Sequence, residues 1–213
     1  MRRRALLVVA VSVLVSVGAI LASNMGFKIS YGFVAAATGV SKTGRQTLGL
    51  PYLRKPGLDT ASDLYQNIQS QGIAALSIER FDPLNDSNSP YPGPAGDFSL
   101  ASGEGYLIRV ASDGDYKIVG SHDPDVQITF KAGAAGISKT GRNFFAPPYH
   151  ALATTASELL QEIGPVAVQV ERFSPLTDTY SPYPGPAGDF SLSRGEAYLV
   201  RVVQDVTYVP GHY

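Results

Sequence analysis

The chain has 213 residues, of which 44% are hydrophobic and only 16% are charged, so its composition favours a packed core. Its 17 basic and 18 acidic side chains give a net charge of -1, which argues against nucleic-acid binding because that function needs a basic surface. The sequence contains no cysteine, which excludes disulfides, thiolate metal sites and thiol nucleophiles.

The N-terminal segment has the layout of a secretory signal peptide. Arg2, Arg3 and Arg4 precede a largely apolar run from Ala5 to Ala22, and polar residues follow. We predict that residues 1–23 are a signal peptide. The alternative is an uncleaved anchor, because the run is at the lower limit for crossing a bilayer of about 30 Å. Both interpretations place the rest of the chain in the periplasm, on the cell surface or outside the cell, and after cleavage we expect no membrane span.

The sequence contains an internal duplication. Residues 89–100 read SPYPGPAGDFSL, and residues 181–192 are identical. Shorter matches occur in the same order on both sides, for example Glu79–Phe81 with Glu171–Phe173 and Ser41–Arg45 with Ser138–Arg142. This self-similarity predicts two tandem homologous modules, the first at residues 24–123 and the second at residues 124–213.

Alternating hydrophobic and polar residues predict strands, the first at Phe27–Val34 and the next at Thr47–Tyr52. In residues 74–79, the alternation places Leu76 on the buried face with Ala74 and Ile78, and in the second copy it places Val168 there with Val166 and Val170. Farther along, Tyr106–Val110 and Tyr116–Gly120 are predicted to form a hairpin across the turn at residues 113–115.

One short helix is predicted in each module. Thr60 and Asp63, like Thr155 and Glu158, have the spacing of a capping box at a helix N-terminus. Together these elements predict a mainly β (α+β) protein in which each module is a small antiparallel β-barrel or sandwich of about five strands with one covering helix. We expect each module to have its own core. The patterns do not decide between barrel and sandwich.

The motifs that resemble enzyme signatures are incomplete. Residues 42–44 read Lys-Thr-Gly, as in penicillin-binding enzymes, but the chain has no Ser-x-x-Lys sequence to accompany them. Residues 39–44 resemble the start of a phosphate-binding loop, but the lysine that should follow Gly44 is replaced by Arg45. We therefore interpret this stretch as a β-turn in which Gly44, and Gly141 in the second copy, adopt a positive φ.

Metal binding is also not expected. The three histidines, His122, His150 and His212, lack carboxylates at ligand spacing, apart from Asp123 beside the first of them. The acidic loop at residues 82–88 has the oxygen ligands that calcium prefers, but the second copy retains only Asp178 of it. We predict no metal and no cofactor.

The identical proline-rich segment is the strongest candidate for a binding surface. Its prolines fix an extended backbone, so holding aromatic side chains toward a partner would cost little further entropy. The alternative is that the aromatic rings pack inward and the loop only connects two strands. The candidate binding residues are Tyr91, Asp97 and Phe98 in the first copy and Tyr183, Asp189 and Phe190 in the second.

These observations favour an exported, non-enzymatic structural or adhesive protein, such as a surface, matrix or filament subunit. Two copies of one surface would raise avidity toward a partner. That partner would be another copy of the chain or a different surface component. The alternative is a secreted or periplasmic protein that binds a glycan or another small ligand, with Tyr91 and Tyr183 as stacking platforms.

Overall fold

The computed structural model describes residues 27–213 except 40, 52, 55–56, 122, 124, 134–139 and 212–213. The predicted signal peptide and two of the histidines, His122 and His212, lie outside the described residues, as do Tyr52, Pro124 and the start of the second copy's Ser138–Arg142 motif.

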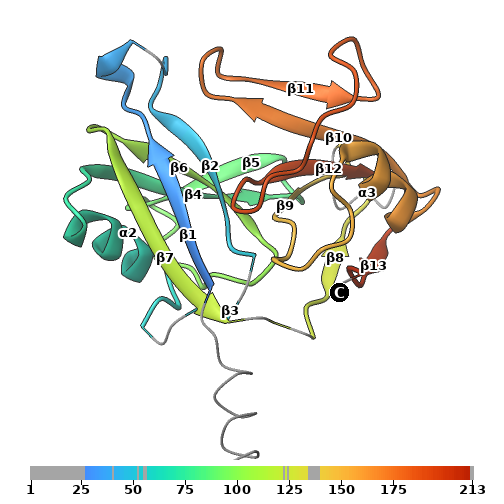
Figure 1. Ribbon diagram of the computed structural model, residues 1–213, viewed down its shortest axis with the longest axis horizontal. Coiled ribbons are helices and arrows are strands. Elements are labelled where there is room, and N and C mark those ends of the chain that lie inside the picture. The colour runs from blue at the N-terminus through green and yellow to red at the C-terminus, as the bar shows by residue number, and fades with distance from the viewer. Residues whose placement is uncertain are drawn as a thin grey trace, which may run out of the picture.

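The two modules lie side by side with their helices at opposite outer ends (Figure 1). In the first module, the described residues form β1 (Phe27–Phe33), a 3-10 helix η1 (Ala36–Thr38), β2 (Arg45–Gly49), β3 (Leu53–Arg54), α2 (Ala61–Ser70), β4 (Ala75–Asp82), β5 (Ser87–Tyr91), β6 (Gly105–Val110) and β7 (Gly114–Ser121). In the second module they form β8 (Ile128–Phe130), β9 (Arg142–Phe145), α3 (Ala156–Ile163), β10 (Ala167–Ser174), β11 (Thr179–Tyr183), β12 (Tyr198–Val202) and β13 (Val206–Tyr208).

Each module has two antiparallel sheets. The first module has a four-stranded sheet in the order β2-β6-β4-β5 and a three-stranded sheet in the order β1-β7-β3. The second repeats this plan with β9-β12-β10-β11 and the pair β8-β13. Each module also has its own core of buried residues, one including Tyr106 and Tyr116 and the other including Tyr198 and Tyr208. The predicted mainly β fold with one short helix per module is therefore confirmed.

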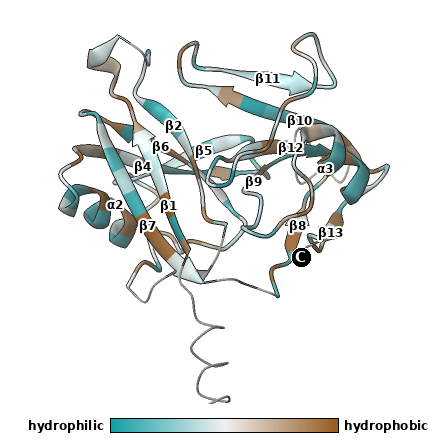
Figure 2. Ribbon diagram, viewed as in Figure 1, coloured by the Kyte–Doolittle hydropathy of each residue, from teal (hydrophilic) through white to brown (hydrophobic). Residues whose placement is uncertain are grey.

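Both helices begin with the predicted capping boxes. In α2, Thr60 Oγ1 accepts a hydrogen bond from the Asp63 N–H, and the Asp63 carboxylate accepts one from the Thr60 N–H; Thr155 and Glu158 do the same in α3. Each helix buries apolar residues on one face and has hydrophilic residues on the other, so both kinds appear in turn along the ribbon (Figure 2). The helix at one end of each module therefore covers the module's own core.

The predicted hairpin between Tyr106–Val110 and Tyr116–Gly120 is wrong. β6 pairs with β2 and β4, whereas β7 pairs with β1 and β3, so the chain crosses from one sheet to the other between them. Residues Gly114 to Gly120 pair instead with β1, which comes from the start of the module. A turn sequence between two strand patterns shows that the chain bends, but it does not show which strand becomes the neighbour.

The predicted faces of β4 and β10 are also partly wrong. Leu76 is 46% exposed and Val168 is 40% exposed, although both were expected on the buried face. The pairing register of β4 with β6 shifts between Ala75 and Ser77, and the register of β10 with β12 shifts at the equivalent place. This irregularity adds one residue to the strand and breaks the period of two, which turns the side chain of that residue outward.

A third apolar cluster joins the two modules. It contains the buried residues Leu107, Phe144, Phe173, Ala197 and Leu199, with Phe81 and Tyr180 packed against it. The cluster thus draws on both four-stranded sheets, which explains why Leu107 is buried although its neighbours Tyr106 and Ile108 face the first module's own core. Burial among these groups raises the pKa of Tyr180 to about 12, and the nearby Glu171 carboxylate adds to the shift.

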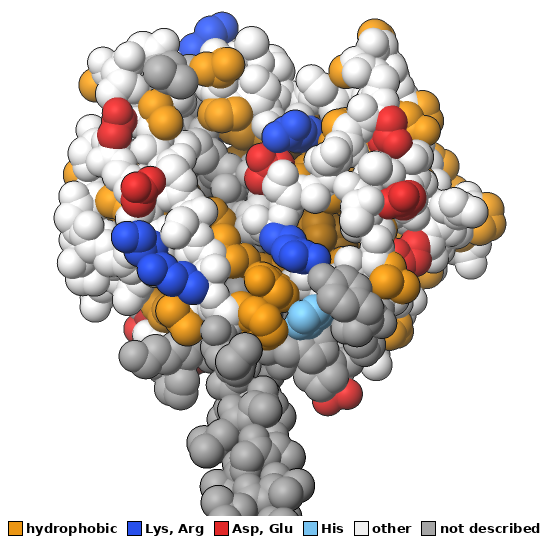
Figure 3. Space-filling view, viewed as in Figure 1, with side chains coloured by type: hydrophobic (Ala, Val, Ile, Leu, Met, Phe, Trp, Pro, Cys, Tyr) orange, Lys and Arg blue, Asp and Glu red, His pale blue; other side chains and the backbone are white. Residues whose placement is uncertain are grey.

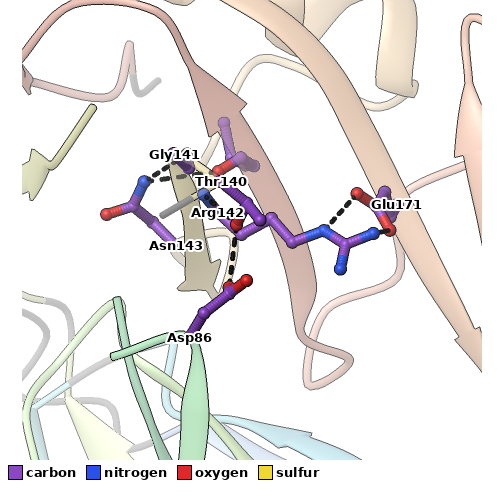
Figure 4. A network of polar contacts seen from close by, with 7 residues as sticks. Asp86, Thr140, Gly141, Arg142, Asn143 and Glu171 are labelled. Carbon is purple, nitrogen blue, oxygen red and sulfur yellow. Dashed lines mark hydrogen bonds and ion pairs between the residues drawn. The ribbon is translucent and has the colours of Figure 1, made fainter. Parts of the chain in front are cut away.

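The polar contacts between the modules are reciprocal. Thr43 Oγ1 donates to Asp178 at 3.2 Å, and the equivalent Thr140 Oγ1 donates to Asp86 at 2.8 Å (Figure 4). Main-chain contacts between the modules are reciprocal as well. Gly49 N–H donates to Gly195 O, and the equivalent Ala146 N–H donates to Gly103 O. Matching positions in the two copies therefore meet in a nearly twofold arrangement.

A buried acidic side chain in each central strand is paired with an arginine. Arg142 makes two hydrogen bonds of 2.8 and 2.9 Å to Glu171, whose side chain is only 3% exposed (Figure 4). Arg45 pairs with Glu79 in the same way in the first module. The paired arginines account for the burial of two carboxylates that the strand pattern predicts to be exposed.

Within the part of the chain that the structure describes, no helix has both the length and the apolar character needed to cross a membrane.

Candidate functional site

A recess between the two modules, lined by residues of both, is called the open cleft here. It has a volume of about 610 Å³ and is lined by residues 30–33 and 46–47 of the first module and 172–176, 181 and 193–196 of the second. A hollow between the modules is visible in Figure 3. Its volume lies within the range of about 300–1,000 Å³ that is usual for ligand sites.

The first-module wall of the open cleft is formed by the ends of β1 and β2. The Gln46 side chain joins them, accepting a hydrogen bond from the Val34 N–H and donating one to the Val34 carbonyl, both at 3.0 Å. Deeper in, the Tyr31 hydroxyl donates to Gly49 O at 2.8 Å. These contacts hold two strands that belong to different sheets at a fixed separation.

The second-module wall carries the charges. Arg172 and Glu196 form an ion pair at 3.0 Å, with side chains 46% and 35% exposed. This contact raises the pKa of Arg172, against the opposing effect of partial burial. Arg194 lies at the rim, with its guanidinium 4.9 Å from the centre of the Tyr149 ring. The charged side chains that line this wall are therefore two arginines and one glutamate.

The near-twofold arrangement produces a second recess at the equivalent place, called the filled cleft here. It has a volume of about 210 Å³ and is lined by residues 127–130 and 143–144 of the second module and by Phe81, Pro83 and residues 101–104 of the first. The difference in size has a clear structural cause. Phe144, which is buried in the shared cluster, occupies the position equivalent to Thr47 in the open cleft. The rim differs as well, since Ser102 replaces Arg194.

The predicted binding aromatics lie elsewhere and are half-buried. Tyr91 packs against the first core with its ring edge-on to Tyr65, and Phe98 stacks on Tyr106 with ring centres 6.1 Å apart. Tyr183 and Phe190 pack against the second core, and Phe190 is stacked on Tyr198. None of these aromatic residues lines either cleft.

The two predicted binding aspartates contact the helices. Asp97 accepts hydrogen bonds from the N–H and the hydroxyl of Ser62, in the first turn of α2. Asp189 accepts the same two bonds from Ser157 in α3, and the hydroxyl bond lowers the pKa of Asp189. These contacts anchor the end of the identical proline-rich loop to the start of the helix in each module.

The incomplete enzyme motif has a structural role. Gly44 and Gly141 adopt φ angles of 69° and 73°, as predicted for a turn before a strand. A Cβ atom at Gly44 would lie 2.5 Å from the Val110 carbonyl oxygen, so no larger residue fits. The preceding threonines, Thr43 and Thr140, make the reciprocal contacts between the modules.

The acidic loop of the first module is engaged by protein groups. Asp82 accepts hydrogen bonds from the Leu84 N–H and the Asn85 amide, and Asp86 accepts one from Thr140. His150 lies against the rings of Phe27 and Tyr149. Among the residues described, no group of three or more histidine and acidic side chains is placed to hold a metal ion.

The open cleft could not be identified from either copy alone, because its lining comes from separate segments of both. A comparison of the copies does contain a signal. Thr47 stands opposite Phe144, two residues after the matching Ser41–Arg45 and Ser138–Arg142, and Arg194 stands opposite Ser102, directly before a matching Gly-Glu.

No family model, curated protein or solved structure matches this chain.

Proposed function

We propose that this chain is an exported, non-enzymatic adhesive protein that attaches to another surface component through the open cleft. The observation that carries the proposal is the inequality of the two clefts. One is filled by Phe144 as part of a shared core, whereas the other has Thr47 at that position and retains a volume of about 610 Å³. We therefore expect one binding site in each chain.

The lining of the open cleft suits recognition. It combines apolar surface from Pro175 and the exposed Leu176 with hydroxyl groups such as that of Ser181, and it adds the charges of Arg172 and Arg194. A recess with apolar walls and a few directed polar groups is the usual form of a binding site. Export rests on the N-terminal sequence pattern.

The test is to fill the open cleft with the residue that fills its counterpart. Thr47→Phe should abolish binding of the labelled protein to the surface of the cells that produce it. Gln66→Phe is the matched control, because it adds the same ring on the exposed face of α2 at the outer end of the first module. Binding that survives Thr47→Phe, or that is lost equally in both variants, would contradict the proposal.

A secreted carbohydrate-binding protein is the second candidate. The hydroxyl groups of the open cleft, including those of Ser30, Ser181 and Ser193, favour it because they suit a ligand rich in hydroxyl groups. Saturable binding on an oligosaccharide array that Thr47→Phe abolishes would support this candidate over attachment to a protein.

The filament hypothesis has one structural feature against it. β5 and β11 are edge strands, and they contain Pro90 and Pro182, which have no N–H to donate to an added strand. We therefore propose attachment rather than growth of a continuous sheet at these edges. Sedimentation velocity over a range of protein concentrations tests this, with a single species expected.

A further inference from the structure

The main chain of β1 directs hydrogen-bonding groups toward the open cleft. Val34, which directly follows β1, shows which way the main-chain groups point. Its N–H and its carbonyl both bind the Gln46 side chain and therefore point toward β2. Alternate residues of a strand turn these groups to the same side. Ser30 and Gly32 therefore present their N–H and carbonyl groups toward β2 and the cleft, on the side of β1 opposite to its partner β7.

The main chain of β2 faces the same space. Gly49 N–H donates to Gly195 O at 2.6 Å, and Gly49 O accepts from the Tyr31 hydroxyl, so both groups point away from the paired strand β6. By the same alternation, Thr47 presents its N–H and carbonyl to the cleft. β1 and β2 are edge strands of different sheets, and the open cleft lies between their edges.

The pattern of lining residues supports this geometry. Four consecutive residues of β1, from Ser30 to Phe33, line the open cleft. Successive side chains of a strand point to opposite faces, so a recess over one face would be lined by every second residue. The cleft therefore follows the edge of the strand. Gly32 lies in this stretch, and glycine within a strand is typical of places where another backbone approaches closely.

The charge of the open cleft indicates which side chain it receives. Arg172, Arg194 and Glu196 sum to one positive charge. At the equivalent positions of the filled cleft, Arg80 and Glu104 form an ion pair at 3.5 Å and Ser102 is neutral, so the charges cancel. The additional cation at the rim is specific to the open cleft, and it complements an acidic group.

We propose that the open cleft binds an extended segment of another polypeptide, which adds as a strand along the edge of β1 and carries an acidic side chain toward Arg194. This inference rests on the proposed function and names its ligand class. Main-chain hydrogen bonds to Ser30 and Gly32 supply affinity, and the arginine supplies selectivity. A four-residue stretch that follows Ser30 to Phe33 spans about 13 Å, at the usual rise per strand residue.

A random six-residue peptide library displayed on phage is the probe. It is selected on the wild-type protein after depletion on Thr47→Phe, and the strongest selected peptide is synthesised for titration by fluorescence anisotropy. We expect enrichment of Asp or Glu with strand-forming neighbours. Arg194→Ser, which copies the filled cleft, should remove the preference for acidic residues.

Two variants at one position test the strand pairing. Gly32→Pro removes the N–H that faces the cleft and should weaken peptide binding by about tenfold or more. Gly32→Ala is the matched control and should leave the affinity within about twofold, because it keeps the N–H and its Cβ would meet only Asp115 Oδ1, at 3.8 Å. The peptide can also be methylated on every second amide nitrogen. Methylation of the set of nitrogens that faces β1 should abolish binding, and methylation of the other set should not.

Three results would overturn the inference. The first is that no peptide is enriched over the depleted library, and the second is that Gly32→Pro and Gly32→Ala bind the selected peptide equally. The third is that the protein binds an oligosaccharide array but no peptide, and that Thr47→Phe abolishes this binding. That result would contradict the peptide ligand but would still support the open cleft as the binding site. If neither peptides nor oligosaccharides bind in a way that Thr47→Phe abolishes, the proposed function fails as well.

Discussion

Two positions at which the copies differ decide the shape and the charge of the clefts. A threonine at position 47 leaves one recess open, and a phenylalanine at position 144 fills the other and joins the shared cluster. Arg194 and Ser102 then determine whether the rim of a cleft carries a guanidinium group or a hydroxyl group. Each of these differences has a measurable consequence for stability or binding.

The first prediction concerns Phe144, which is 8% exposed. Phe144→Thr should lower the free energy of unfolding by about 3 kcal/mol, because it removes a large aromatic side chain from a packed cluster. Urea unfolding at neutral pH measures the change. Thr47→Phe is the counterpart and should cost much less, since it adds a side chain where there is free volume. Equal losses in the two variants would show that the open cleft does not have room for a ring.

The second prediction concerns the buried ion pair. Arg142→Ala should lower the free energy of unfolding by about 3 kcal/mol, because it leaves the buried Glu171 carboxylate without its partner. Lys131→Ala breaks the exposed pair with Asp205 and should cost about 1 kcal/mol or less. A cost for Arg142→Ala no larger than that for Lys131→Ala would show that water replaces the guanidinium.

At the scale of helices and strands, local signals were reliable and pairing was not. The capping boxes at Thr60 and Thr155 could be read from the sequence because all their atoms lie within one turn of the chain. The irregularities at Leu76 and Val168 could not, because an extra strand residue depends on the register with the neighbouring strand. The wrong hairpin after β6 has the same origin.

The third prediction concerns the anchor between the proline-rich loop and α3. The Ser157 hydroxyl holds the pKa of Asp189 below its ordinary value of 3.8, so the carboxylate favours the folded state when it is ionised. This contribution is present above pH 3.8 and is lost as the pH falls through the lowered pKa. Asp189→Asn should therefore reduce the dependence of stability on pH in acid, measured by urea unfolding between neutral pH and strong acid.

Ser157→Ala is the companion variant, because it removes the hydroxyl donor and leaves the carboxylate in place. It should flatten the same part of the pH profile. An unchanged profile in both variants would show that the loop is anchored by its aromatic residues alone.

At the scale of the whole molecule, the duplication could be predicted from the sequence and the contact between the copies could not. Residues such as Leu107 and Leu199 lie on the second face of a sheet whose first face already covers a core. A strand buried on both faces loses the simple alternation from which a strand is predicted. The open cleft could not be predicted either, because it exists only where the two copies meet.

The fourth prediction follows from the shared cluster. A fragment of residues 124–213 retains the second core but exposes Phe144, Phe173 and Leu199 to water. It should unfold at a lower temperature than the whole chain, and addition of a fragment of residues 24–123 should raise that temperature. Circular dichroism melting curves of the two fragments, alone and mixed, provide the measurement. Equal melting temperatures for the isolated fragment and the whole chain would show that the shared cluster contributes little.

The reciprocal contacts between Thr43 and Asp178 and between Thr140 and Asp86 have the geometry of an isologous dimer interface, in which position i meets position j and position j meets position i. In a homodimer of a single module, the two clefts would be related by symmetry, and any substitution would open or close both. When the two copies belong to one polypeptide, a substitution in one copy changes only one of the two clefts. The same surface can then be packed as core on one side, where Phe144 lies, and be kept free for a ligand on the other.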